Sequence, residues 1–483
     1  MKKTFYVTTA IDYVNSEPHQ GHLYQKVIAD IFSRWHNSSG EDVFFLTGTD
    51  EHGQKLFNTA KEQRLTPKQL VDENSEKFKE AWKLMNINPN RFIRTTDEDH
   101  IRTAQEITKK IYKKGDIYKG IYEGLYCEGC EAYLTEKELV NGECPFHKKT
   151  PKILKEETYF FKLSKYQNQL LDYYEKNPKF ILPLTRRNEI INRVKEGLKD
   201  LSITRTNFDW GIKFPLNEEH VIYVWWEALC SYISGVNYPK SKFKRYWPAD
   251  IQLLGVDNGW FHTVIWPAML IAAGIKPPKT VFIHGFLTFN KQKISKSLGN
   301  TISPKYLAKK YGVDQLRYFL TREIPFGQDG DFSEESLKNR INNELANELG
   351  NLVSRTLTIS KKLKEIKKHP AEMNFDVKKI GELMEDYKIT ESLNEIWKYV
   401  QETNRYINQK EPWKLQGKEL EIVLYNCLES IRKISILLWP FIPGTCEKIQ
   451  SLLDVKYQNL KTFNKEIKTY NPKGPEILFK KIN

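Results

Sequence analysis

The sequence predicts an α/β protein in which a parallel-sheet domain is split by an insertion and followed by an α-helical domain. Strand-like runs alternate with helical periodicity between residues 4 and 53 and return between 221 and 289. The segment between them is rich in tyrosine and carries paired cysteines, whereas the pattern beyond about residue 330 is helical. A chain of 483 residues has room for about three domains.

The first strand, a helix and a second strand are expected within residues 4–53. The run TFYVTTAI (4–11) is β-branched and aromatic, as in a buried strand. Apolar residues then recur at helical spacing from Leu23 to Trp35, and DVFFLTGTDEHG (42–53) is a strand that ends in a polar loop. Polar residues at strand ends are typical of a parallel α/β sheet. Further strands of this sheet are expected at VIYVWWEAL (221–229), DIQLLGVD (250–257) and TVFIHGFLTF (280–289).

The composition favours a soluble protein with a polyanionic partner. The formal net charge is +14, from 75 Lys and Arg against 61 Asp and Glu, although a merely solvated basic surface gives the same balance. No stretch approaches the roughly eighteen apolar residues of a membrane span, and Asp12 interrupts the N-terminal apolar run well short of a signal-peptide core. We therefore expect a cytoplasmic protein that does not enter a membrane.

Three cysteines and a histidine form a predicted zinc site. Cys127, Cys130, Cys144 and His147 follow the pattern C-x2-C-x13-C-x2-H, in which each tight pair presents two ligands to one side of a tetrahedral ion. The alternative is a coincidence of buried thiols and a surface histidine. Four protein ligands leave no coordination site for water, so we expect one structural Zn²⁺ per chain, which stabilises only the insertion.

The motif HQGH is a candidate phosphate site at the start of the first helix. His19 and His22 flank Gly21 at the junction between the predicted strand and the predicted helix. Helix N-termini bind anions through their N–H groups, and a glycine allows a nucleotide close to the backbone. A pair of histidines that only caps the helix explains the same residues equally well.

A second candidate phosphate site is the polar loop NKQKISKSLGN. Lys293 and Lys296 flank Ser295 directly after a predicted strand. Lysines so spaced can surround a triphosphate as mobile point charges. Lysine- and serine-rich loops are, however, commonly just solvated.

Together the two motifs resemble the signature pair of class I aminoacyl-tRNA synthetases. The resemblance narrows to the methionyl-tRNA synthetase family, because further blocks follow the order and approximate spacing of that family. These blocks are VTTAIDYVNSEPHQGH, FLTGTDEHGQK, the CxxC…CxxH insertion, YVWWEAL, WFHTVIWPAML, FIHGFLTFNKQKISKSLGN, NELANELGNLVSR and EPWKL. The resemblance implies ATP-dependent activation of L-methionine to methionyl-adenylate, with release of pyrophosphate, and transfer to tRNA(Met) with release of AMP.

The resemblance also implies which residues contact each substrate. The catalytic residues are His19, His22, Lys293 and Lys296. ATP, bound with Mg²⁺, contacts His19, Gly21, His22, Asp257, Lys293, Ser295 and Lys296. Methionine contacts Ala10, Ile11, Tyr13, Asp50, Trp225, Ala228, Leu229, Tyr232 and His262. Asp50 would hold the ammonium group, and the polar tips of Tyr13 and His262 could hydrogen-bond the sulfur, while taken singly each aromatic residue could equally be core packing.

The anticodon readers implied by the resemblance are Asn351, Arg355 and Trp413. The first two are four residues apart and share one helix face. An amide, a guanidinium and a stacking plane suit unstacked loop bases, although surface or interhelical packing roles remain the plainer alternative.

The implied domain order places a Rossmann-like catalytic domain on both sides of the insertion. The segments are 1–116 (catalytic, first half), 117–224 (connective insertion with a knuckle at 127–147), 225–292 (catalytic, second half), 293–345 (lysine loop and stem contact) and 346–483 (α-helical bundle that binds the anticodon). Because no dimerisation module is seen, a monomer is expected.

The sequence departs from the family pattern at four positions. Ile294 stands where Met is common, and Val256 and Asn258 interrupt a Gly-Lys-Asp-Ile run beside the expected ribose contact. Gln20 stands between the histidines where the family has an apolar residue. We expect Gln20 to face away from ATP, toward a hydrogen-bond partner or water.

Four other functions fit parts of the sequence. The leucine, isoleucine and valine enzymes need a much larger insertion for editing, and a cysteine enzyme places its zinc in the amino-acid pocket. A small-molecule adenylyltransferase leaves the helical third unexplained. A zinc-knuckle RNA-binding protein leaves the aromatic residues without a role.

Overall fold

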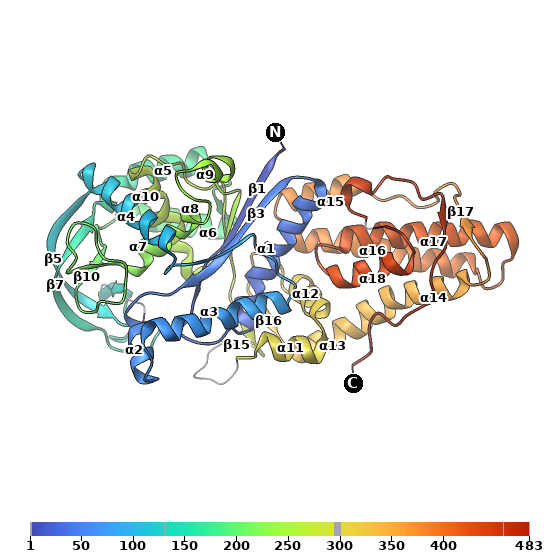
Figure 1. Ribbon diagram of the computed structural model, residues 1–483, viewed down its shortest axis with the longest axis horizontal. Coiled ribbons are helices and arrows are strands. Elements are labelled where there is room, and N and C mark those ends of the chain that lie inside the picture. The colour runs from blue at the N-terminus through green and yellow to red at the C-terminus, as the bar shows by residue number, and fades with distance from the viewer. Residues whose placement is uncertain (1, 130–131, 135, 294–300, 457, 483) are drawn as a thin grey trace.

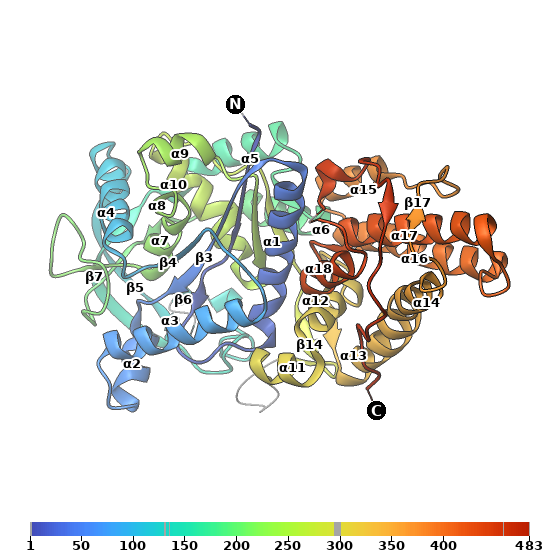
Figure 2. The same cartoon turned by 45° about the vertical axis from the view of Figure 1, so that its right-hand side comes forward.

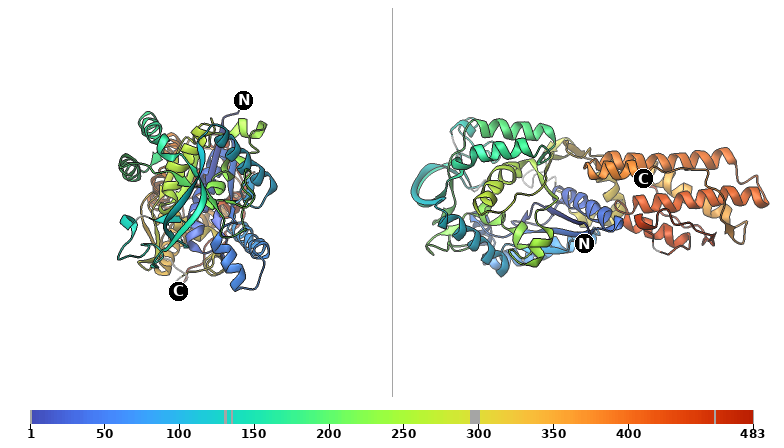
Figure 3. Two further views of the ribbon diagram at one scale, coloured as in Figure 1. Left: turned by 90° about the vertical axis from the view of Figure 1, so that its left-hand side faces the viewer. Right: turned by 90° about the horizontal axis from the view of Figure 1, so that it is seen from above.

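The computed structural model describes residues 2–129, 132–134, 136–293, 301–456 and 458–482. The main β-sheet lies in one part of an elongated molecule and the helices that follow residue 333 gather at the other end (Figure 1). Seen from above, the orange and red helices extend from the sheet domain as a bundle of their own (Figure 3). The predicted α/β domain followed by a helical domain is confirmed.

The main sheet has seven strands and is built from both halves of the predicted catalytic domain. The strands are β1 (Thr4–Thr9), β2 (Asp12–Tyr13), β3 (Asp42–Asp50), β4 (Arg91–Arg94), β8 (Ile181–Leu182), β12 (Ile251–Gly255) and β13 (Val281–His284). Their order is β2-β3-β1-β12-β13-β8, with β4 also paired to β3. All these pairings are parallel. The carboxyl ends of the strands therefore share one edge, where ligands bind in sheets of this type.

Helices cover both faces of the sheet, which explains why β1 and β3 are continuous apolar runs rather than alternating ones. One face packs on α1 (Gln20–Ser39), α2 (Gln54–Glu62) and α3 (Pro67–Leu84). The other face packs on α4 (Glu98–Lys113), α5 (Gln167–Lys176), α6 (Leu184–Lys195), α7 (Val224–Ala228), α8 (Ser231–Ser234), α9 (Ser241–Tyr246) and α10 (Trp266–Ala272).

Helix α1 has well-defined ends. His19 is its N-cap, and Gly40 ends it in the left-handed conformation at φ 97°, with its N–H donating to Asn37 O. A Cβ on Gly40 would meet only the far end of the flexible Lys461 side chain, so it is the left-handed backbone conformation that favours glycine there.

The insertion forms an antiparallel sheet of its own. Its strands are β5 (Ile117–Cys127), β6 (Ala132–Leu134), β7 (Lys152–Phe161) and β9 (Leu201–Ser202), in the order β6-β5-β7-β9. A separate pair is formed by β10 (Thr204–Arg205) and β11 (Val221–Ile222). Strand β8 lies inside the predicted insertion 117–224 but pairs with β13, so this segment also supplies the edge strand of the main sheet.

The prediction of a strand at residues 221–229 is wrong for most of that segment. Only β11 is extended, and it does not join the main sheet, whereas Val224–Ala228 is helix α7. The run was apolar and aromatic because the helix is buried among other helices, and a short apolar run does not distinguish a buried helix from a strand. Likewise, the run 280–289 divides between β13 and β14 (Leu287–Phe289) of a small sheet with β15 (Gln292–Lys293) and β16 (Gly330–Phe332).

The remainder of the chain is helical, as predicted. The helices are α11 (Pro304–Tyr311), α12 (Val313–Arg322), α13 (Glu334–Arg340), a π-helical segment (Ile341–Gly350), α14 (Asn351–Ser360), α15 (Val377–Glu385), α16 (Ile389–Lys410), α17 (Gly417–Leu438) and α18 (Pro443–Leu452). A single short ribbon joins β17 (Ile366–Lys367) to β18 (Thr469–Tyr470) among the described residues.

The helical domain is joined to α1 by a buried arginine. Arg317 of α12 donates from Nη2 to Asp30 Oδ2 at 2.7 Å and to the carbonyl of Pro440 at 2.9 Å, and from Nε to the carbonyl of Phe441 at 3.0 Å. Both Arg317 and Asp30 are buried. Helix α1 therefore lies between the sheet and the helices of the C-terminal half (Figure 2), and one apolar core is continuous through both. Within the described residues, none of the helices combines the length and the apolar character that a membrane crossing requires.

Candidate functional site

The carboxyl edge of the main sheet brings the predicted substrate residues together. Ala10 follows β1, Asp50 ends β3 and Asp257 follows β12, and these three strands are direct neighbours. Tyr13 of β2 pairs with Asp50, and Ala10 N–H donates to Leu253 O at 2.9 Å. The residues implied for methionine and for ATP thus begin on adjacent strands of one sheet edge.

The histidines of HQGH cap α1 with their Nδ1 atoms. His19 Nδ1 accepts the N–H of Gly21 at 3.1 Å, and His22 Nδ1 accepts the N–H of His19 at 3.2 Å. A neutral imidazole whose Nδ1 accepts carries its proton on Nε2, so both rings present Nε2–H as a donor. The ring centroids are 3.9 Å apart. Capping and phosphate binding are therefore compatible roles, because the cap fixes the tautomer that a phosphate oxygen requires.

Gln20 lies between the histidines in sequence and is fully buried. Its backbone N–H donates to Ile302 O at 3.0 Å, and its Oε1 accepts the N–H of Ile302 at 2.5 Å. The expectation that Gln20 has a protein hydrogen-bond partner is confirmed. The two bonds join the first turn of α1 to the chain that follows the lysine motif.

Tyr232 and His262 form a buried hydrogen-bonded pair among the residues predicted to contact methionine. The Tyr232 hydroxyl lies 2.6 Å from His262 Nε2, and His262 Nδ1 lies 2.9 Å from the carbonyl oxygen of Asn258. Because a carbonyl only accepts, His262 carries its proton on Nδ1, and Tyr232 donates to Nε2. Burial lowers the pKa of His262 to about 4, so the ring is neutral at physiological pH.

This arrangement changes the expected role of His262 and explains how Asn258 is tolerated. Both ring nitrogens of His262 are engaged by protein atoms, so the histidine orients the Tyr232 hydroxyl. Asn258 contributes its backbone carbonyl, which any residue supplies. The departure at this position therefore leaves the orientation of His262 unchanged.

Three other predicted methionine residues lie at one short helix, with Trp225 and Ala228 in α7 and Leu229 directly after it. Ala228 and Leu229 are buried, and Trp225 is half-buried and stacks on Phe261 with centroids 4.0 Å apart. Burial raises the pKa of Tyr232, and the charge of Asp50 raises it further. The set is apolar and aromatic with one carboxylate, which suits a thioether amino acid.

A buried triad anchors this wall and was not assigned from the sequence. Glu227 of α7 accepts from His52 Nδ1 at 2.8 Å and from His100 Nε2 at 2.7 Å. Burial opposes the ionisation of Glu227, but the two histidines outweigh it and hold the pKa of this carboxyl below its usual range. His52 follows Asp50 by two residues, so the triad holds the Asp50 loop against the helix that carries Trp225. The signal in the sequence was the histidine in TDEHG.

The structure describes only part of the residues predicted to contact the ribose and the pyrophosphate. Asp257 lies in a short 3-10 turn, and a Cβ on Gly255 would come within 2.9 Å of its Oδ1 and 3.5 Å of the His284 ring, so the glycine leaves space at this point. Lys293 ends β15, antiparallel to Thr288 of β14. Ser295 and Lys296 lie outside the described residues.

Three of the four predicted zinc ligands converge. His147 Nδ1 lies 3.9 Å from Cys127 Sγ and 3.7 Å from Cys144 Sγ, and both thiols are buried. Tetrahedral zinc with Zn–S near 2.3 Å and Zn–N near 2.1 Å requires ligand separations of about 3.6 Å, so the three atoms fit one ion. Cys130 lies outside the described residues.

A second His/Glu cluster lies between α1 and α15. His36 Nδ1 is 3.2 Å from Glu41 Oε2 and 4.0 Å from Glu385 Oε1. The ammonium group of Lys3 bonds both carboxylates, at 3.0 and 3.4 Å. The cluster is thus an ion-pair network that already contains its own cation.

The predicted anticodon residues share one surface of the helical domain. Asn351 is exposed on α14, and Arg355, one turn later, donates to Asn408 Oδ1 at 2.8 Å. The Arg355 guanidinium lies 6.0 Å from the ring of Trp413, which is 42% exposed. Within the described residues, Nε and Nη2 of Arg355 are buried and have no hydrogen-bond partner.

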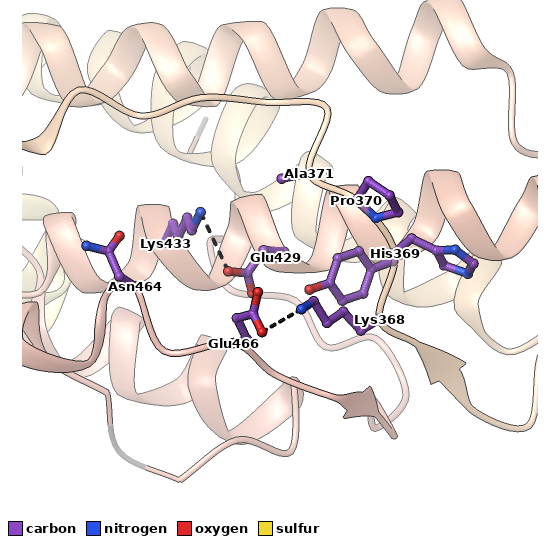
Figure 4. A pocket seen from close by; sticks show the side chains of 9 residues that line it. Lys368, His369, Pro370, Ala371, Glu429, Lys433, Asn464 and Glu466 are labelled. Atoms are coloured by element: carbon purple, nitrogen blue, oxygen red, sulfur yellow. Dashed lines mark ion pairs between the residues drawn. The ribbon is translucent and has the colours of Figure 1, made fainter.

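Among the described residues, cavities are also present outside these sites. One, of about 430 Å³, is in the helical domain near Lys368, Tyr425 and Lys433 (Figure 4). Its lysines pair with its carboxylates, Lys368 with Glu466 and Lys433 with Glu429, so no net charge is offered to a ligand. The other, of about 400 Å³, lies where the start of α6 meets the residues before α16.

Comparison with known proteins agrees with this geometry. The family model for tRNA synthetases class I (M) matches residues 5–152 and 137–357, and the model for the anticodon-binding domain of tRNA ligase matches residues 336–476. Methionine–tRNA ligase of Caldanaerobacter subterraneus subsp. tengcongensis is 47% identical over 100% of this chain and 80% of its own length. The protein of that name from Rickettsia felis is 45% identical over 94% of this chain and 93% of its own.

Solved structures give the same result. Mycobacterium tuberculosis methionyl-tRNA synthetase in complex with methionyl-adenylate superposes with a TM-score of 0.94 at 38% identity, over 99% of both chains. The apo form of that protein superposes with a TM-score of 0.88 at 35% identity, over 100% of this chain and 99% of that one.

Proposed function

The chain belongs to the methionyl-tRNA synthetase family of class I aminoacyl-tRNA synthetases, enzymes that join methionine to tRNA with ATP, and on this premise we propose which of its residues perform each step. The observation that carries the proposal is the shared carboxyl edge of β3, β1 and β12. Asp50 ends β3 at that edge. Beside it are the hydrogen-bonded pair of Tyr232 and His262 and the histidines that cap α1.

Methionine is held with its ammonium group on Asp50 and its side chain against Trp225 and the Tyr232 hydroxyl. The hydroxyl is oriented by His262, so its oxygen, rather than the imidazole, faces the thioether. Sulfur–aromatic contacts at such a wall are worth up to about 1.5 kcal/mol each. The remaining contacts in this proposal are Ala10, Ile11, Tyr13, Ala228 and Leu229.

ATP lies across the start of α1, with its magnesium ion on the phosphates. The Nε2–H groups of His19 and His22 donate to phosphate oxygens, Gly21 lies under the adenine, and Asp257 holds the ribose. Lys293, Ser295 and Lys296 surround the pyrophosphate. The methionine carboxylate attacks the α-phosphorus in line, the new P–O bond forms, and the bond to the β-phosphate breaks to release pyrophosphate.

No protein group needs to be covalently modified in this step. The catalytic contributions are positioning of the two substrates and stabilisation of charge that develops on the phosphates. The terminal hydroxyl of tRNA(Met) then attacks the mixed anhydride, which transfers the methionyl group and releases AMP.

The insertion and the helical domain serve the tRNA-bound enzyme. Cys127, Cys130, Cys144 and His147 would hold one Zn²⁺ with a closed shell, which stabilises the tip of the insertion and takes no part in the reaction. Asn351, Arg355 and Trp413 read anticodon bases. We further propose that the enzyme is a monomer and acts in the cytoplasm.

The test is ATP–pyrophosphate exchange with each of the twenty amino acids in turn. We expect exchange with methionine alone. Exchange with a different amino acid would reassign the specificity, and its absence with every amino acid would overturn the synthetase proposal.

A further inference from the structure

A buried ion pair joins α1 to the segment that follows β1. Lys26, in the second turn of α1, is fully buried, and its ammonium group donates to Asp12 Oδ1 at 2.8 Å and to the carbonyl oxygen of Ala10 at 2.7 Å. With the Gln25 amide turned so that its oxygen faces Lys26, a third bond of 3.1 Å completes the donors of this ammonium group. All three N–H groups of Lys26 are therefore directed at fixed acceptors.

The segment held by Lys26 carries part of the proposed methionine site. Residues 10–13 include Ala10, Ile11 and Tyr13, and only Asp12 among them has no role in the proposed function. Asp12 belongs to the two-residue strand β2, whose register with β3 places Asp12 opposite Thr49 and Tyr13 opposite Asp50. Two pairings are too few to fix a strand, so the ion pair supplies a constraint that the ladder lacks.

The pair joins an element of each proposed substrate site. Asp12 lies in β2 beside Tyr13, whose partner in the ladder is Asp50, and Lys26 lies one turn after His22 on α1. Burial raises the pKa of Tyr232 and the charge of Asp12 adds to this effect, while burial lowers the pKa of His284 and the charge of Lys26 adds to that one.

The pair does not exist for stability alone. Burial raises the pKa of the Asp12 carboxyl to about 6 and lowers the pKa of the Lys26 ammonium group, despite their mutual attraction. Within the described residues, Asp12 Oδ2 has no hydrogen-bond partner, so the carboxylate is incompletely compensated. Buried pairs of this kind are commonly replaced by neutral groups of similar shape without loss of stability.

We propose that Lys26 and Asp12 are positioning residues for methionine, which fix residues 10–13 against α1 so that the amino-acid wall and the ATP-binding histidines keep a set separation. This inference rests on the proposed function. Lys26 and Asp12 touch no reacting atom. They act through the Ala10 carbonyl and through the ladder that joins Tyr13 to Asp50.

The test replaces the pair by a neutral one of similar shape, Asp12→Asn with Lys26→Met. Exchange kinetics with methionine and ATP, and thermal unfolding, are measured against wild type. We expect an unfolding temperature no lower than that of wild type, a KM for methionine raised about tenfold or more, and a KM for ATP within about twofold. The matched control removes the exposed pair of β5 and β7, Lys119→Met with Glu157→Gln, and should change neither KM.

The outcomes separate the two proposals. An unchanged KM for methionine in a folded, active double variant overturns the positioning role, and so does an equal rise of both KM values. Absence of methionine-dependent exchange in wild type instead overturns the proposed function.

A second measurement on wild type covers the case in which the double variant fails to fold. Methionine affinity is measured by calorimetry without ATP from pH 8 to pH 5. Asp12 loses its charge below about pH 6, so affinity should fall there. Of the other titratable groups, Tyr232 interacts with the charge of Asp12 and His284 with the charge of Lys26. Affinity that is flat to pH 5 overturns the proposal.

Discussion

Replacing Gln20 by methionine removes one hydrogen bond between the start of α1 and the chain beyond the lysine motif. Methionine has a side chain of similar length without an acceptor, so the bond from Ile302 N–H to Oε1 is lost, and the bond from the Gln20 backbone to Ile302 O remains. The change therefore removes a side-chain hydrogen bond of a fully buried residue.

The expected cost follows from the position of the donor. Ile302 is half-buried, so its N–H is only partly able to find water, and an unpaired donor of this kind costs about 1–2 kcal/mol. His19 precedes Gln20, and Lys296 precedes Ile302 by six residues, so the lost bond loosens the connection between two groups proposed to share the phosphates. If the cost falls on ATP binding, the KM for ATP rises about five- to thirtyfold.

Pyrophosphate exchange at saturating methionine measures this effect. The control is Gln105→Met on α4, which removes an exposed bond to Lys213 O and should leave the KM for ATP unchanged. A Gln20→Met enzyme with wild-type KM for ATP and wild-type thermal unfolding would refute the reasoning.

Four further results are expected. Lys296→Ala should lower methionine-dependent exchange at least a hundredfold while methionine affinity measured by calorimetry stays within about twofold, since the lysine is proposed to act on the pyrophosphate; wild-type exchange would remove it from the mechanism. Arg355→Ala should weaken tRNA charging but spare methionine activation, and equal loss of both would indicate a folding role. Removal of zinc by a chelator, or the substitution His147→Ala, should unfold the knuckle alone. One zinc ion per chain should be released, the knuckle should become sensitive to proteolysis, and pyrophosphate exchange should be retained. A zinc-free protein whose knuckle stays folded would contradict this prediction. The pKa of His262 is about 4 in the folded protein and near 6.5 in the unfolded chain, so its contribution to stability is present above pH 6.5 and is lost, by roughly 3 kcal/mol, as the pH falls toward 4. The decrease in unfolding free energy over this pH range should therefore be smaller in His262→Asn, and an identical decrease in the variant and wild type would contradict the pKa of His262.

The sequence was sufficient for those parts of the fold that periodicity determines. The strands at 4–9, 42–50 and 251–255 are buried on both faces and appear as apolar runs bounded by polar residues. Helix α7 was mistaken for a strand because a five-residue buried helix has no amphipathic period to detect. Strand β8 has two residues and is defined only by its partner β13, which is distant in sequence.

The residues proposed for the site come from the sequence resemblance, whereas their hydrogen bonds could not be predicted from the sequence. The resemblance supplied Tyr232 and His262, but the proton on His262 Nδ1 follows from a backbone carbonyl that only the structure places. The sequence indicates the Lys26–Asp12 pair only weakly, through a lysine among the apolar positions of α1 and an aspartate at the end of a strand. Side chains that satisfy one another across separate elements leave no local pattern by which sequence reasoning could find them.

Arg317 couples the helical domain to the helix whose first turn carries the histidines proposed to bind phosphate. Gln20 and Asp30 are separated by ten residues of that helix, about 15 Å. Arg317 holds the Asp30 end together with the carbonyls of Pro440 and Phe441. A displacement of the helical domain must therefore either break these bonds or move α1, and with it the proposed phosphate-binding turn.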